Sequence, residues 1–213
     1  MQAVLAGASV ALGVPATVSA IHELDLHSDI ESLGIFEAQG KSFVETVTRL
    51  GENVPQTAAE QLDLAFALLA QGDDRTLTQE MRALVVDKAA QGFRAYLSIV
   101  PGDGRAWAGL ASAEIARGGS RRGAEALKMS ILTAPWSGSL VQWRCGLGID
   151  LFRVLNAEER ELMKGQFRVA AQRSPAALVQ TVIRRGGARI ARTFLASSPD
   201  ELVKFEIELA SRH

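Results

Sequence analysis

Few residues of this chain combine the type and the spacing that catalysis or metal binding requires. The three histidines, His22, His27 and His213, lie toward the two ends of the chain. Two imidazoles share one face of a helix when they are four residues apart, as in the His-Glu-x-x-His zinc motif, whereas His22 and His27 are five apart. The sequence therefore predicts no metal site and no catalytic histidine.

The single cysteine, Cys145, directly follows Trp143 and Arg144. An adjacent arginine can lower the pKa of a thiol and make it nucleophilic. A lone cysteine on an amphipathic helix more often behaves as a small buried hydrophobic residue, and we expect this second situation. One cysteine also excludes an intramolecular disulfide and a thiolate-rich zinc site.

The glycine-rich turns and the paired carboxylates lack the surroundings of reactive sites. Gly102-Asp103-Gly104 and Gly186-Gly187 have neither the preceding strand nor the Lys-Ser/Thr that phosphate-binding loops need, so they indicate turns. Asp73-Asp74 and Glu158-Glu159 lie in a loop and at a helix start, where negative charge stabilises the helix dipole. Since no general acid or base can be named, we predict that the protein is not an enzyme and needs no cofactor.

Five side chains remain as candidates for contact with a partner: Trp136, Arg144, Arg185, Arg189 and Arg192. Tryptophan and arginine are common interface anchors, and Trp136, in a turn, is expected to be exposed. The last three arginines share one face if a helix runs through Gly186-Gly187. Such a face suits phosphate headgroups or an acidic polymer, because guanidinium groups are planar, bidentate donors. A solvated face without a ligand is the alternative.

These candidates belong to a chain whose apolar residues recur with a helical period. One stripe comprises Leu140, Trp143, Leu147, Leu151 and Val154. No run of period-two alternation bounded by hairpin turns is found, so the expected fold class is all-α. Capping boxes predict helix starts at Thr57…Glu60, Thr76…Gln79, Asn156…Glu159 and Ser198…Glu201, the last with Pro199 at the first helical position.

Pro101 and Pro135 are 34 residues apart, which is the period of the tetratricopeptide unit. Between them, Trp107, Leu110 and Ala111 on a first helix, with Leu127 and Ser130 on a second, resemble the tetratricopeptide pattern. The resemblance implies stacked antiparallel helical pairs, an α-solenoid. Glu114 stands where the family has an aromatic residue and Gly123 where it has alanine, which affects the regularity of stacking rather than the pairing. An ordinary helical bundle is the alternative.

A narrower set of residues also resembles tetratricopeptide-like accessory proteins of bacterial surface-polysaccharide assembly. It comprises Trp107, Leu110-Ala111, the Thr133-Ala134-Pro135-Trp136 turn and Arg144. This resemblance implies a place in a polysaccharide assembly or export complex.

Residues 1–21 carry no charged side chain and are mostly small or aliphatic. The small residues Val18-Ser19-Ala20 resemble a signal-peptidase site. Because about 20 apolar residues span a bilayer core, an uncleaved membrane anchor is a second interpretation. No Lys or Arg precedes the apolar run, so the basic region that begins a signal peptide is missing. A buried N-terminal helix is the third interpretation. The first two predict a periplasmic or inner-membrane-anchored protein of bacteria, and the third a cytoplasmic one.

Four segments are therefore expected: a signal or anchor at 1–21, an N-terminal helical segment at 22–56, tetratricopeptide-like repeats at 57–175 and a C-terminal helical cap at 176–213.

The 213 residues are 47% hydrophobic, enough for a substantial core. Residues 1–100 carry a net charge of -7 and residues 101–213 one of +6, an asymmetry that can orient neighbouring molecules or meet an anionic partner. A dedicated nucleic-acid-binding protein would be more basic overall.

Together these features predict a non-catalytic scaffold for protein–protein interaction at the bacterial cell envelope. One alternative is an accessory factor of a polysaccharide assembly or export complex that contacts an anionic polysaccharide or lipid headgroups. Another is a cytosolic regulatory repeat protein.

Overall fold

The computed structural model describes residues 57–72, 74 and 76–212, and the regular structure of this part is helical. The helices are α3 (Ala58–Gly72), α4 (Gln79–Ile99), α5 (Gly104–Ala116), α6 (Ser120–Thr133), α7 (Gly138–Asp150), α8 (Ala157–Arg173), α9 (Pro175–Arg185), α10 (Ala188–Leu195) and α11 (Pro199–Ala210). No strand occurs among the described residues, so the predicted all-α fold is confirmed. The segments 1–21 and 22–56, with their predicted signal or anchor and helical segment, lie outside the described residues.

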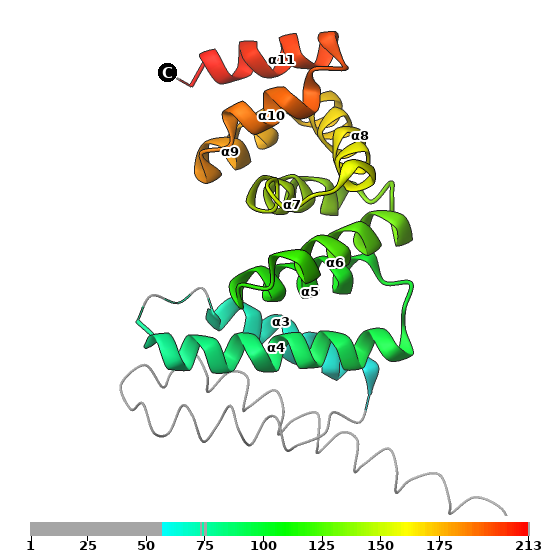
Figure 1. Cartoon of the computed structure of the whole chain (residues 1–213), viewed down its shortest axis with the longest axis vertical. Coiled ribbons are helices and arrows are strands. Elements are labelled where there is room, and N and C mark those ends of the chain that lie inside the picture. Colours follow the sequence, from blue (N-terminus) through cyan, green and yellow to red (C-terminus); the bar gives the residue numbers. More distant parts are fainter. Residues whose placement is uncertain (1–56, 73, 75, 213) are drawn as a thin grey trace, which may run out of the picture.

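Consecutive helices pack in adjacent pairs, α3 with α4, α5 with α6 and α7 with α8. In addition, α5 lies against α3, α7 against α5, α9 against α7 and α11 against α9. The helices follow one another along the long axis of the molecule, from α3 and α4 to α11 (Figure 1). Each helix buries apolar residues against its pair partner and against the next pair, and these residues form a hydrophobic core.

Two of the predicted capping boxes are present. The Oγ1 of Thr57 accepts a hydrogen bond from the Glu60 amide at 3.2 Å, and the Glu60 carboxylate accepts one from the Thr57 amide at 3.4 Å. Asn156 and Glu159 exchange the same pair of bonds, both at 2.9 Å. These bonds satisfy amides that have no partner within the helix, so α3 and α8 begin where the sequence predicts.

The box predicted at Thr76…Gln79 is wrong, because α4 begins two residues later than that pattern implies. Its cap is Thr78, whose Oγ1 accepts a hydrogen bond from the Met81 amide at 3.2 Å. The hydroxyl of Thr76 donates instead to the Asp74 carboxylate at 2.9 Å. A nearby carboxylate thus holds the hydroxyl in the turn before the helix.

The box predicted at Ser198…Glu201 is also wrong, although α11 does begin at Pro199 as predicted. The Ser198 side chain makes no capping hydrogen bond. The Glu201 carboxylate accepts a hydrogen bond from Nε2 of Gln172 in α8 at 2.7 Å. The Glu201 carboxylate therefore binds Gln172 of α8 rather than the amide of Ser198 that the capping box would require.

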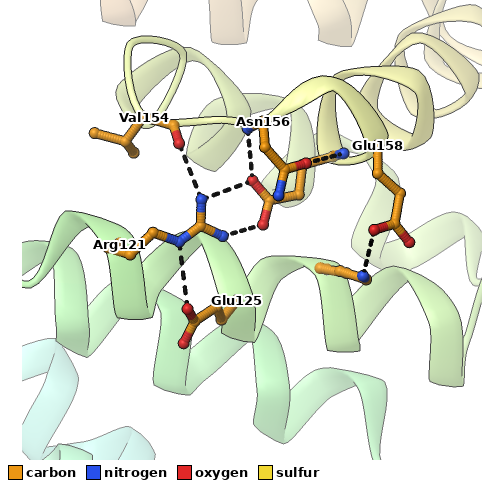
Figure 2. A network of polar contacts seen from close by, with 7 residues as sticks. Arg121, Glu125, Val154, Asn156 and Glu158 are labelled. Carbon is orange, nitrogen blue, oxygen red and sulfur yellow. Dashed lines mark hydrogen bonds and ion pairs between the residues drawn. The ribbon is translucent and has the colours of Figure 1, made fainter.

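An ion-pair network joins α6 to the start of α8. Arg121 of α6 bonds both carboxylate oxygens of Glu159 and donates to the Val154 carbonyl oxygen at 3.0 Å. Figure 2 shows Arg121 lying between Glu125 of its own helix and the loop at Val154 and Asn156. Burial raises the pKa of Glu159, but hydrogen bonds from Arg121 and from the Asn156 backbone outweigh it and hold the pKa below its usual value. The same carboxylate thus caps α8 and binds α6.

The chain breaks at Gly186, so α9 and α10 are separate helices. Gly186 has a φ of 61°, in the left-handed region that glycine adopts without steric cost. The turn expected at Gly186-Gly187 is therefore present, and the continuous helix on which Arg185, Arg189 and Arg192 would share one face is not formed.

Substitution of Gly186 by alanine is expected to lower the free energy of unfolding by about 1 kcal/mol, because a Cβ disfavours a positive φ. The matched control is Gly165→Ala in the middle of α8, where an added Cβ would meet nothing within 4 Å. That change should raise the free energy of unfolding by about 0.5–1 kcal/mol, since alanine is the better helix former. Urea denaturation followed by circular dichroism measures both, and equal effects would contradict the assignment of the break.

Candidate functional site

Three adjoining cavities lie along the stack of helices, the second lined mainly by α4, the central one by α3, α5 and α7, and the third by α7 and α9. The central cavity has a volume of about 450 Å³. A second, of about 690 Å³, shares Gly72, Val86 and Ala116 with it. A third, of about 460 Å³, shares Trp143 and Arg185 with the central one. Because neighbouring cavities have walls in common, we treat the three as one continuous groove.

The middle of the groove is apolar and aromatic. Its side chains include Phe66, Leu69, Ile115, Trp143 and Leu147. The ring centroid of Trp143 lies 6.2 Å from that of Phe66, and its Nε1 donates to the Ser112 hydroxyl at 3.1 Å. Trp143, which the sequence places on an apolar stripe, therefore packs against the core and also forms part of the groove wall.

The two ends of the groove are basic. Arg82, Arg117 and Arg122 line the second cavity, and Arg184 and Arg185 line the third. The acidic side chains among the described residues that line the groove are Asp87 and Asp150. Asp87 pairs with Arg117 and Asp150 with Arg185. The lining of the groove thus has an excess of positive charge.

Glu114 lies behind one basic end and is 1% exposed. Its carboxylate meets three arginines that come from different segments: Arg94 of α4, Arg117 after α5 and Arg122 of α6. The distances to Arg117 Nη1 and Arg122 Nε are 3.3 and 2.9 Å. One carboxylate therefore holds three helices together and leaves the surrounding guanidinium groups with net positive charge.

Arg144 is 0% exposed, so the structure does not place it where a partner could reach it, contrary to our expectation for this residue. Its Nε donates to the Ser130 hydroxyl at 2.9 Å and its Nη1 to the Ala134 carbonyl oxygen at 2.9 Å. Its Nη2 donates to the Ser130 carbonyl oxygen, and Nη1 also lies 3.4 Å from Gln166 Oε1. Burial lowers the pKa of Arg144 to about 10, which leaves it protonated at neutral pH. The cation thus ties α7 to the C-terminal end of α6, where the helix dipole favours positive charge.

Trp136 is exposed, as the sequence predicts, with 74% of its surface accessible in the turn between α6 and α7. It is not among the residues that line the groove. Its contact with a partner stays a prediction.

The structure separates the three C-terminal arginines by their contacts. Arg185 reaches into the groove and pairs with Asp150 of α7. Arg192 forms two hydrogen bonds, of 2.6 and 3.0 Å, with the carboxylate of Glu206 in α11. Arg189 is exposed and has no ion pair with the described part of the chain. Two of the three therefore stabilise helix contacts rather than forming a shared basic face.

Cys145 is fully buried, as expected for a lone cysteine on an amphipathic helix. Burial raises the pKa of its thiol despite the neighbouring Arg144, and a protonated thiol is a poor nucleophile. No group of three or more His, Cys, Asp or Glu within residues 57–72, 74 and 76–212 could hold a metal ion. None of the helices in this same part is long and apolar enough to cross a membrane.

Sequence reasoning missed three of the arginines at the ends of the groove, Arg82, Arg117 and Arg122. They lie in or next to α4, α5 and α6, and up to 40 residues separate them along the chain. The sequence contains no spacing that would bring them together, because their proximity depends on how the helical pairs pack.

Gly123, which stands in place of the alanine of the tetratricopeptide pattern, lies where α6 crosses α5 closely. A Cβ at this position would lie 3.1 Å from Ile115 Cγ1 and 3.3 Å from the Ala111 carbonyl oxygen. These distances are shorter than ordinary van der Waals contact, so the glycine allows α5 and α6 to approach more closely than alanine would.

The residues that carry the tetratricopeptide resemblance lie within one helical pair and the turn that follows it. Trp107 and Leu110 belong to α5, Leu127 and Ser130 to α6, and Pro135 to the turn before α7. The Trp107 Nε1 donates to the Pro101 carbonyl oxygen at 2.8 Å and so links α5 to the preceding turn. Comparison of the chain with protein-family models, with curated proteins and with solved structures finds no match.

Proposed function

We propose that this protein is a non-catalytic scaffold, a tetratricopeptide-like solenoid that binds a segment of another protein in the groove. The observation that carries the proposal is the succession of adjoining cavities from α4 across α3, α5 and α7 to α9. In a stack of helical pairs each pair adds a strip of surface and contacts only its neighbours, which yields an extended binding surface. A groove of this kind suits a polypeptide segment better than a compact small molecule.

The chemistry of the groove supports binding rather than catalysis. Its wall combines an apolar middle with arginines at both ends, and arginine and tryptophan are frequent anchors at interfaces. The proposed place of the scaffold at the bacterial cell envelope depends on the apolar segment 1–21 and stays a prediction.

Filling the junction of the groove is expected to abolish partner binding. Ala116 is exposed at the end of α5 and lines both the central and the second cavity, so Ala116→Trp adds bulk there without disturbing the core. The immobilised full chain is expected to capture a partner protein from an extract of the source cells. The immobilised variant should capture at least about tenfold less of that partner. Quantitative mass spectrometry of the retained proteins measures the difference.

The matched control is Ala196→Trp, an exposed alanine after α10 that does not line the groove. This variant should retain the same partner as the unchanged protein. Equal retention by all three proteins would contradict binding in the groove.

A further inference from the structure

We infer that the groove binds an extended polypeptide segment that carries acidic residues at both ends and apolar residues between them. The inference rests on the proposed function and specifies the chemistry of the partner. Its basis is the order of side chains along the groove, which runs from arginines through aromatic and aliphatic residues to arginines again.

The charge of the lining selects against a basic partner. Five arginines and two aspartates line the groove in the described part of the chain, with neither lysine nor glutamate among them. Arg184 has no ion pair with the described residues, and Glu114 is shared by three arginines. Carboxylates of a partner would therefore find guanidinium donors at both ends, and arginine binds carboxylates with two parallel hydrogen bonds.

The apolar middle selects against a purely anionic polymer. Phe66, Trp143 and Leu147 line the central cavity, and a polymer with charge at every unit would leave them without an apolar contact. Burial of apolar side chains from a peptide in this cavity is favourable, since it removes apolar surface on both sides from water.

The helix spacing sets the length of the segment. From the second cavity to the third, successive contacts join α4 to α5, α5 to α7 and α7 to α9, and packed helices lie about 8–10 Å apart. The groove therefore extends over about 24–30 Å, which about seven to nine residues cover in an extended conformation.

Binding of synthetic peptides to the full chain tests this inference by fluorescence anisotropy. The first probe is a labelled nine-residue peptide with two glutamates at each end and Phe-Ser-Leu-Ser-Leu between them. A second probe has lysine in place of every glutamate, and a third has serine in place of Phe and Leu. We expect the first peptide to bind at least about tenfold more tightly than either of the others, and its affinity to fall at high salt.

Charge reversal in the groove should affect the first peptide selectively. Arg184→Glu is expected to weaken its binding about tenfold, whereas Arg189→Glu, an exposed arginine outside the groove, should change it less than about twofold. Circular dichroism of both variants confirms that they fold. Ala116→Trp should also abolish peptide binding. Loss of binding in this variant would show that the peptide lies in the groove.

Three outcomes would overturn the inference. Equal or tighter binding of the lysine peptide would exclude an acidic partner, and equal binding of the serine peptide would show that the groove binds anionic polymers in general. No binding of the first peptide would also exclude the inferred segment. In each case a partner whose retention depends on Ala116 would still support the scaffold function, so the two proposals can fail separately.

Discussion

Replacement of Arg144 by alanine is expected to lower the free energy of unfolding by about 3–5 kcal/mol. The side chain is fully buried and donates to the hydroxyl and carbonyl oxygens of Ser130 and to the carbonyl oxygen of Ala134. Its removal leaves these buried acceptors without a donor, each at a cost of about 1–3 kcal/mol, and opens a cavity between α6, α7 and α8. Urea denaturation at neutral pH, followed by circular dichroism, measures the loss.

Two variants separate the buried hydrogen bonds from the effect of losing a positive charge. Arg144→Lys retains the charge but not the planar set of donors, so it should lose most of the same stability. Arg189→Ala removes an exposed arginine and should change the free energy of unfolding by less than about 0.5 kcal/mol. A loss below about 1 kcal/mol for Arg144→Ala would contradict the structural role of this residue.

Replacement of Glu114 by glutamine is expected to lower the free energy of unfolding by about 2–4 kcal/mol. The change preserves the shape of the side chain and removes its negative charge. Glu114 is buried, and its carboxylate meets Arg94, Arg117 and Arg122. Without it the three cations repel one another, which weakens the junction of α4, α5 and α6. The measurement is again urea denaturation.

The matched control for this prediction is Glu125→Gln in α6. Glu125 is 63% exposed and pairs with Arg121 at 3.3 Å, and exposed ion pairs contribute about 0–1 kcal/mol. Added sulfate should restore part of the stability of Glu114→Gln by screening the arginines, and should restore less in the control. Equal losses in the two variants would contradict the central role of Glu114.

The sequence by itself determined the features that depend on neighbouring residues. The helical period of the apolar residues predicted the all-α fold, because the burial of one helix face requires that period. The capping boxes at Thr57 and Asn156 were predicted correctly, since both partners of each box lie within three residues. The burial of Cys145 was predicted because a lone cysteine on an amphipathic helix behaves as a small hydrophobic residue.

Sequence patterns gave the wrong result where a distant residue competes for the same group. Glu201 binds Gln172 of α8 rather than capping α11. At Gly186-Gly187 the expected turn is present, and it leaves Arg185 and Arg192 on separate helices.

Only the tertiary structure decided which polar side chains are buried and which meet in the groove. Arg144 has the residue type of an interface anchor, yet it lies in the interior because the C-terminal carbonyl groups of α6 need donors there. The groove brings together side chains from Phe66 to Arg185, separated by more than a hundred residues of sequence. A local pattern cannot encode such a surface, because it arises from the angles and distances at which successive helical pairs pack.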